Sequence, residues 1–176
     1  ENLTWEKNKT FDAGIDFSIW NSRISGSVDY YNKKTYDLLQ DVPLSRTSGF
    51  TVQSRNLGSM RNSGIEASLN VQIINSRDFS WSVFGSIATV KNEILKLAPS
   101  IDGKPIDINA GSSYRKTEEG RPFMSWFMPT WAGVNAQTGA PEWYLNGIDG
   151  EKTSDFNKAQ RVFQGTAIPK YTGGFG

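Results

Sequence analysis

The sequence contains no cysteine and no histidine. Disulfide bonds, thiol nucleophiles, zinc sites built on these residues and histidine-based catalytic triads are therefore excluded. An excess of one charge is also absent, since 19 lysines and arginines stand against 18 aspartates and glutamates, for a formal net charge of +1. This balance provides no bulk electrostatic attraction for nucleic acid. We therefore expect no nucleic-acid partner.

Long apolar runs are missing as well, and the mean hydropathy is −0.48. No stretch approaches the roughly 20 apolar residues that a transmembrane helix needs. The chain instead has 12% aromatic residues and 17 glycines among its 176 residues. It opens on Glu1 without an initiator methionine and stops at Gly176 within a strand-like pattern. We expect it to be a piece of a longer protein.

Apolar residues alternate with small or polar residues over 11–20 and again over 23–31. Successive side chains of a strand point to opposite faces, so each tract predicts a two-faced β-strand. A two-residue turn at Asn21 and Ser22 predicts a hairpin. Its register pairs Ile19 with Ile24, Phe17 with Gly26, Ile15 with Val28, and Ala13 with Tyr30. Because a one-residue slip would separate these apolar faces, the register is well specified.

The alternation returns after Gly64, over residues 65–73 and 79–87, with a short turn expected at 75–78. Pairing Ile73 with Phe79 again places apolar side chains together, although Phe84 interrupts the polar face. The pattern therefore predicts hairpins at about 10–33 and 63–92. Long connections follow at about 35–59 and 95–167.

The strand tracts alternate over roughly 9–11 residues, the length of a tilted transmembrane strand rather than of an ordinary soluble one. Their apolar faces carry no charge, and short turns at one end contrast with long loops at the other. This combination predicts an all-β fold, an antiparallel transmembrane β-barrel segment with long extracellular loops. The alternative is a soluble β-sandwich whose apolar face packs on a second sheet, such as a carbohydrate-binding module.

Aromatic residues lie near both ends of the apolar faces. Phe17, Phe79 and Trp81 lie towards the short turns, and Phe11 and Tyr30 lie towards the long loops. On the barrel interpretation they form the two aromatic girdles at the membrane interfaces. On the sandwich interpretation they are ordinary hydrophobic packing.

A set of short segments, taken in their order along the chain, resembles a known protein family. The segments are residues 3–7, 11–17, 26–35, 37–39, 56–66, 78–81, 91–94, 131–135, 138–144 and 169–175. The runs at 30–35 and 58–66 are the most specific. Together these segments resemble the barrel region of SusC/RagA-like TonB-dependent transporters, which are outer-membrane proteins of Bacteroidetes. One departure is at residues 135–137, where Asn-Ala-Gln stands and the family often has Asp-Pro-Glu.

The resemblance implies that residues 1–176 are a fragment of the C-terminal part of a 22-stranded barrel. It also implies an N-terminal plug domain and a TonB-contacting segment, neither of which is expected in this stretch. A SusD-like surface lipoprotein would cap the extracellular mouth, with outer-membrane lipid around the barrel. The implied ligand is a glycan or a peptide, imported with energy supplied through TonB.

Aromatic side chains in the long connection are the candidate substrate-binding residues: Trp126, Phe127, Trp131, Trp143 and Tyr144. Aromatic surfaces stack on sugar rings or peptide side chains and can also contact a lid protein. The alternative is that they form the core of the loop itself. Turn residues at 135–139, between two tryptophans, predict a small extracellular hairpin.

Asp12, Asp16 and Asp29 lie on the polar faces of the first hairpin, with Asp29 opposite Gly14. Paired carboxylates can perform acid–base chemistry, as in a glycosidase. Solvation in a wet lumen explains them more simply. No Walker loop, nucleophile elbow or calcium-binding loop occurs. We therefore expect no enzyme activity, no catalytic residue, no cofactor and no metal.

Overall fold

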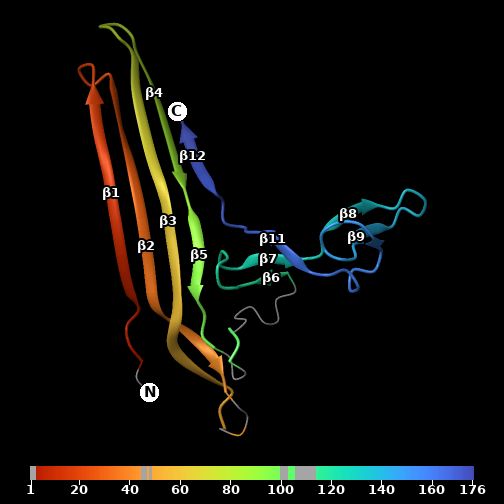
Figure 1. Ribbon diagram of the computed structural model, residues 1–176. Helices are drawn as coiled ribbons and strands as arrows, with labels where there is room; N and C mark the ends of the chain where they lie inside the picture. Colours follow the sequence, from red (N-terminus) through yellow and green to blue (C-terminus); the bar gives the residue numbers. More distant parts are fainter. Residues whose placement is uncertain (1–2, 45–46, 48, 100–102, 106–113) are drawn as a thin grey trace.

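A computed structural model of the chain describes residues 3–44, 47, 49–99, 103–105 and 114–176. All strand pairs in it are antiparallel, and one six-stranded sheet dominates (Figure 1). Across the described residues, no helix combines the length and apolar character needed to span a membrane. Neighbouring strands of the main sheet follow the order β1-β2-β3-β4-β12, and β5 also pairs with β3. Their bounds are β1 Lys7–Ile19, β2 Ile24–Pro43, β3 Val52–Asn75, β4 Ser80–Thr89, β5 Lys91–Lys96 and β12 Tyr171–Phe175.

The predicted register of the first hairpin is confirmed. Ile19 faces Ile24, and the remaining pairs follow as far as Ala13 with Tyr30. Asn21 and Ser22 have φ angles of 53° and 63°, and positive values at both central residues are what a twisted two-residue turn requires. Turn chemistry and apolar matching thus select the same register.

The second hairpin differs from the prediction by two residues, because the partner of Val83 is Val71, whereas pairing Ile73 with Phe79 would have made it Leu69. Ile73 is the extra residue of a β-bulge between Gln72 and Ile74. The turn is tighter than expected, since the Ser76 N–H donates to the Phe79 carbonyl at 2.9 Å. The predicted pairing of Ile73 with Phe79 is therefore wrong. A shift of two keeps the apolar faces together.

The strands β2 and β3 continue beyond the predicted hairpins and pair as far as Pro43 with Val52. Most of the segment 35–59 is therefore strand rather than loop. A bulge at Asp37, with φ of 57°, breaks the alternation there and hides the strand from sequence patterns. Lys7 pairs with the Asp37 carboxylate at 2.8 Å, and Asn56 donates to the Asp37 carbonyl at 2.7 Å.

One face of the main sheet is apolar and uncovered. Large side chains on it remain substantially exposed, including Ile15 at 71%, Leu69 at 44% and Ile87 at 50%. In the part of the chain that the structure describes, no second sheet lies against this face, so the β-sandwich alternative is wrong. The other face is polar, as shown by Ser27 and Ser68, whose hydroxyls lie 2.9 Å apart.

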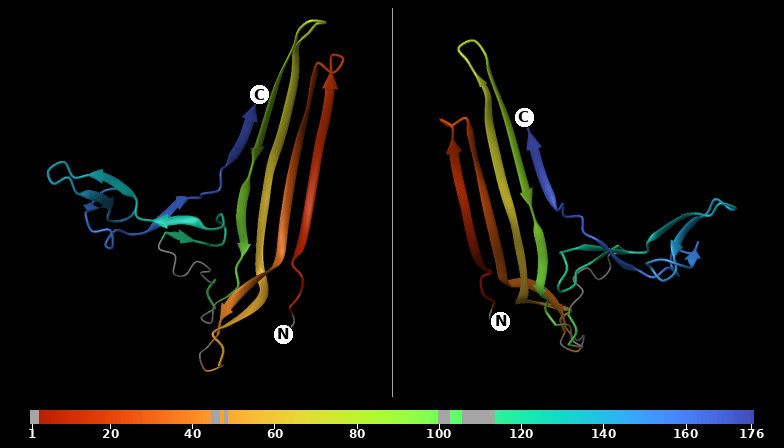
Figure 2. Two further views of the ribbon diagram at one scale, coloured as in Figure 1. Left: turned by 180° about the vertical axis from the view of Figure 1, so that it is seen from behind. Right: turned by 45° about the horizontal axis from the view of Figure 1, so that its top comes forward.

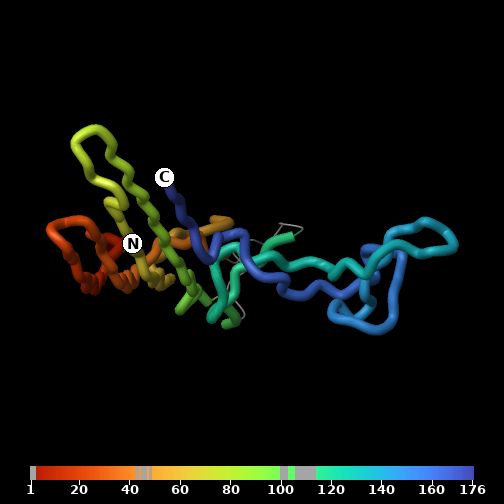
Figure 3. Tube along the Cα trace, turned by 90° about the horizontal axis from the view of Figure 1, so that it is seen from above, coloured from red at the N-terminus to blue at the C-terminus, as the bar shows by residue number. Residues whose placement is uncertain are grey.

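Residues 114–168 form a lobe that projects from one end of the sheet, on the side of β12 (Figures 2 and 3). It leaves β5 and returns to β12. Two small sheets build it, with strands in the orders β11-β7-β6 and β10-β9-β8. Their bounds are β6 Arg115–Lys116, β7 Ser125–Met128, β8 Trp131–Val134, β9 Pro141–Tyr144, β10 Lys152–Thr153 and β11 Val162–Gly165.

The buried apolar core is small and lies where the lobe meets the sheet. Its members are Val42, Ile94, Leu97 and Ala98, with Leu57 and Met60 packed against them. Met60 pairs with Ile94 on the polar face of β3. The core therefore lies under the root of the lobe.

Candidate functional site

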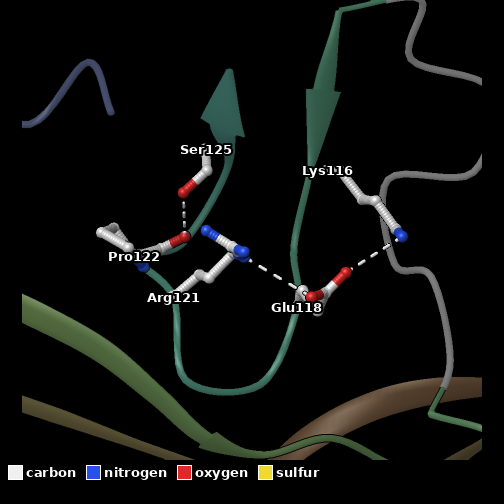
Figure 4. A network of polar contacts seen from close by, with 5 residues as sticks. All are labelled: Lys116, Glu118, Arg121, Pro122 and Ser125. Atoms are coloured by element: carbon white, nitrogen blue, oxygen red, sulfur yellow. Dashed lines mark hydrogen bonds and ion pairs between the residues drawn. The ribbon is translucent and has the colours of Figure 1, made fainter. Parts of the chain in front are cut away.

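The lobe begins with a tight turn between β6 and β7 (Figure 4). The Arg121 N–H donates to the Glu118 carbonyl at 3.2 Å, and Gly120 supplies the positive φ of 78°. The Glu118 carboxylate contacts Lys116 at 3.1 Å and Arg121 at 3.5 Å. The hydrogen bond from Lys116 holds the pKa of Glu118 below its usual range. Backbone and charge together fix the shape of this turn.

The same turn hydrogen-bonds to the edge of β5. Ile94 donates from its N–H to the Arg121 carbonyl at 2.9 Å and accepts from the Gly120 N–H at 2.8 Å. In a third hydrogen bond, the Leu97 N–H donates to the Glu119 carboxylate at 2.8 Å. The root of the lobe thus extends the β5 edge.

A buried asparagine ties the lobe to the polar face. Asn92 accepts a hydrogen bond from the Phe123 N–H at 2.7 Å and donates one to the Asn62 side chain at 2.7 Å. Asn62 and Glu66 share a face of β3, because four residues separate them along an unbulged strand. The lobe is therefore fastened to the polar face, away from the apolar band.

The predicted small hairpin is confirmed in the outer part of the lobe. Trp131 faces Trp143 across β8 and β9, and their rings lie 5.9 Å apart in an edge-to-face arrangement. Asn135 closes the turn by accepting from the backbone N–H groups of Gln137 and Thr138, each at 3.0 Å. The tryptophan pair is thus held by turn chemistry.

Phe156 completes this aromatic cluster, with its ring 5.2 Å from Trp143 and 6.4 Å from Tyr114. Trp131 remains 55% exposed, whereas Trp143 is half-buried. The cluster is therefore both a small core for the lobe and a partly accessible aromatic surface.

A second aromatic group lies nearer the root. Phe127 and Phe163 face each other across β7 and β11 with ring centroids 4.9 Å apart. Arg121 lies over Phe163 at 3.9 Å, and Lys116 lies 5.2 Å from Phe127. Such cation–π contacts stabilise positive charge over an aromatic face.

An open hollow of about 570 Å³ lies between the two small sheets of the lobe. It is lined by Arg121, Phe127, Thr130, Gly147, Ile148, Arg161, Val162, Phe163 and Gln164. Gln164 donates to Thr130, which donates to the Gly147 carbonyl. The hollow therefore combines cationic, aromatic and amide groups, which suit an anionic or peptide-like ligand.

The five predicted aromatic residues do not form one platform. Trp126 and Phe127 are neighbours on β7 and point to opposite sides, as Trp143 and Tyr144 do on β9. Trp126 lies under Arg115, whose guanidinium is 4.5 Å from its ring. Only Phe127 of the five lines the hollow.

Sequence reasoning missed several residues that the lobe brings together, namely Arg121, Phe156 and Phe163. Arg121 and Phe156 lie outside the strands and Phe163 lies on the short strand β11, so none of them belongs to an alternating tract that would reveal its partners. The aspartates of the first hairpin remain on the polar face, and Asp29 faces both Gly14 and Glu66. Among the described residues, no group of three or more acidic, histidine or cysteine side chains is arranged to hold a metal ion.

Comparison with known proteins identifies the architecture. The family model described as TonB dependent receptor-like, beta-barrel matches residues 1–175. TonB-dependent receptor P3 of Formosa agariphila is 32% identical over 192 residues, which cover 99% of this chain and 19% of that protein. TonB-dependent receptor SusC of Bacteroides thetaiotaomicron is 43% identical over 103 residues, which cover 58% of this chain and 10% of SusC.

Solved structures agree along nearly the whole chain. The RagAB peptide importer in its open-open state superposes with a TM-score of 0.82 and 32% identity, over 98% of this chain and 19% of that one. Its closed-closed state gives a TM-score of 0.80 and 31% identity, covering 99% of this chain and 19% of that one. The chain spans about a fifth of the length of such relatives. Its sheet is accordingly an unclosed segment of a barrel, and the chain belongs to the TonB-dependent receptor β-barrel family, among its SusC/RagA-like members.

Proposed function

We propose that this chain forms part of the wall and mouth of a TonB-dependent outer-membrane importer that works with a SusD-like surface lipoprotein. The observation that carries the proposal is the division of the sheet into one face with an exposed, uncharged apolar band and a polar face that holds the lobe. A barrel wall needs such a division, because one face meets lipid and the other meets the lumen. Family members are transporters and receptors rather than enzymes.

The dimensions of the apolar band fit a bilayer. On β3 the band runs from Ile65 to Ile74, which is about 30 Å along an extended strand. With a strand tilt of about 40°, this length spans close to the 25 Å height of an outer-membrane apolar band. The whole of β3 has 24 residues, so it continues well past the band towards the lobe.

The lobe is placed, in this proposal, at the extracellular mouth over the lumen. Its root is bonded to the lumen face through Asn92 and to the β5 edge through the Ile94 backbone, and the short turns lie at the opposite end of the sheet. Trp131 and Trp143 would then meet ligand or the lid lipoprotein, and the hollow beside Phe127 would meet ligand. Arginine and aromatic rings in the hollow support a peptide over an oligosaccharide, since arginine binds carboxylates.

An uptake experiment tests the proposal. Cells lacking the complete receptor would be supplied with a labelled oligopeptide or a labelled oligosaccharide, with and without restoration of the receptor. We expect receptor-dependent peptide uptake that stops when the inner-membrane proton gradient is dissipated. Receptor-dependent uptake of the oligosaccharide alone would show that the ligand is a glycan rather than a peptide. Uptake of neither ligand would overturn the importer function.

The aromatic surface has its own test in the same cells. Trp131→Ala removes an exposed ring without leaving a cavity under a buried side chain, and we expect reduced uptake at unchanged receptor abundance. Val134→Ala is the matched control, because Val134 lies on the same strand and is 59% exposed. Equal uptake by both variants would remove Trp131 from the ligand or lid surface.

A further inference from the structure

A row of positive side chains crosses the sheet just beyond the apolar band. Lys9 on β1 faces Lys34 on β2, Lys34 faces Arg61 on β3, and Arg61 faces Glu93 on β5. Residues that face each other across neighbouring strands point to the same side of a sheet. Four adjacent strands therefore place three cations and one carboxylate in a single line.

This line lies on the same face as the apolar band. Lys9 is two residues from Phe11, Lys34 is four residues from Tyr30, and side chains alternate with a period of two. No bulge interrupts the pairing of β1 with β2 over these positions. In the next row towards the band, Lys91 on β5 faces Ser63 and adds a fourth cation.

The charges in the line are not balanced within the described part of the chain. Glu93 is occupied by Arg61, with Nη2 and Oε2 2.5 Å apart. Lys9, Lys34 and Lys91 make no ion pair with any residue that the structure describes. Like charges placed directly opposite one another destabilise a sheet. A ligand carrying negative charge would relieve the repulsion between Lys9 and Lys34.

The depth of the line identifies that ligand. Lys9 lies about 7 Å beyond Phe11 along the strand, and Phe11 and Tyr30 form a tilted ring pair with centroids 6.4 Å apart at the edge of the band. Aromatic pairs of this kind mark the bilayer interface, and the layer just beyond it contains lipid headgroups. Lysine stems lie along apolar surface while their ammonium groups reach this layer.

We propose that Lys9, Lys34, Arg61 and Lys91 form a binding site for the phosphate groups of lipid headgroups in the leaflet at the lobe end of the barrel. The proposal rests on the proposed function only in requiring the apolar band to face lipid. The site would hold the barrel at a fixed height in the membrane and collect phosphate-bearing lipids around this side of it. An ammonium group near an anionic headgroup contributes roughly 1 kcal/mol to membrane attraction.

The test uses the complete receptor in detergent and a short-chain phosphatidic acid as probe. Binding would be measured by native mass spectrometry, with phosphatidylcholine of the same chain length and inorganic phosphate as separate arms. We expect K9Q/K34Q to weaken phosphatidic acid binding by about five-fold for each lysine removed. K33Q is the matched control, since Lys33 is next to Lys34 but points to the polar face.

The outcomes separate the site from the importer function. Unchanged binding in K9Q/K34Q, or an equal loss in K33Q, would overturn the site. Binding of inorganic phosphate as tight as that of phosphatidic acid would overturn the lipid assignment. K9R/K34R keeps the charges and should retain binding, which guards against a variant that simply folds poorly. Loss of lipid binding with normal peptide uptake leaves the importer intact, whereas failed uptake with normal lipid binding affects only the importer.

Discussion

Leu69 and Asn70 are neighbours on β3 that meet opposite surroundings. Leu69 lies between Gly26 and Gly85 on the apolar face, and Asn70 lies on the polar face. We predict that Leu69→Arg in the complete receptor destabilises the folded barrel by about 2–4 kcal/mol, the cost of a cation near the bilayer midplane. Equilibrium unfolding in lipid vesicles measures this cost. Asn70→Arg is the control and should cost far less, and equal costs would contradict the assignment of faces.

Gly64 is required by a close approach of two strands. A Cβ atom at this position would overlap the carbonyl oxygen of Thr89 and crowd the Tyr31 hydroxyl, which donates to the same carbonyl at 3.2 Å. We predict that Gly64→Ala destabilises the receptor by about 1–3 kcal/mol through overpacking. The loss can be measured by heating samples of the receptor before gel electrophoresis. The folded and unfolded barrels migrate differently, and the variant should unfold at a lower temperature. Gly85→Ala should be nearly neutral, since the nearest atom that the described residues place by its Cβ, the Gly174 carbonyl oxygen, lies at 4.0 Å.

At this scale the candidate site was only partly predictable. Trp131 and Trp143 could be placed together because a recognisable turn at Asn135 fixes which residues face each other. Phe163 could not, because it lies 36 residues beyond Phe127, on a strand with no alternation to set a register. Pairs joined by local turns are visible in a sequence, whereas contacts across long connections depend on tertiary packing.

Among the elements, the root of the lobe depends on one buried side chain. Asn92 bridges Asn62 on β3 and the backbone N–H of Phe123. We predict that Asn92→Ala leaves both partners unsatisfied and loosens the attachment by about 1–3 kcal/mol. Faster hydrogen exchange across residues 117–124, with unchanged exchange in β1 and β2, would measure this. Asn70→Ala, on the same polar face but away from the root, is the control, and similar exchange in both variants would contradict the role of Asn92.

The turn at the root also predicts a dependence on pH. The pKa of Glu118 is lowered chiefly by the hydrogen bond from Lys116, so the folded turn binds a proton less readily than the unfolded one. Its contribution to stability is complete above the ordinary glutamate pKa and is lost as the pH falls through the lowered value. We expect Lys116→Gln to raise the Glu118 pKa, measured by NMR titration of the labelled carboxyl group. An unchanged Glu118 pKa in this variant would mean that the hydrogen bond from Lys116 does not cause the shift. Lys152→Gln is the control, because Lys152 lies outside the ion pairs of Glu118.

The strands show which elements a sequence reveals and which it hides. The first hairpin was predictable to the residue because its turn and its alternation agree. The second was displaced because its turn is tighter than expected, and the bulge at Ile73 then brings the apolar faces of the two strands back into register. The outer half of β2 was missed because its side chains beyond Asp37 no longer separate an apolar face from a polar one. Bulges are set by backbone pairing, which composition does not record.

At the scale of the whole molecule, as far as the described residues go, the sheet has two unpaired edges and an uncovered apolar face. β1 and β12 are terminal strands of the sheet, and Phe175 on β12 is 93% exposed. Open edges and exposed apolar surface lead to association in water. We predict that residues 1–176 expressed alone aggregate without detergent, as measured by size-exclusion chromatography with light scattering. The complete receptor in detergent is the control, and a monomeric, detergent-free fragment would contradict the barrel interpretation.

The lobe enters and leaves the sheet at one place. The Ile94 backbone holds the turn at 120–121, and the Val90 N–H donates to the Lys170 carbonyl at 3.1 Å where the chain returns to β12. β12 then pairs with β4 from Tyr171 onwards, as an ordinary hairpin strand would. A lobe of another length or sequence could therefore be exchanged between residues 97 and 170 without changing any pairing in the wall. With the lobe at the mouth, as we propose, related receptors built this way can diverge in what they accept there while inheriting one and the same barrel.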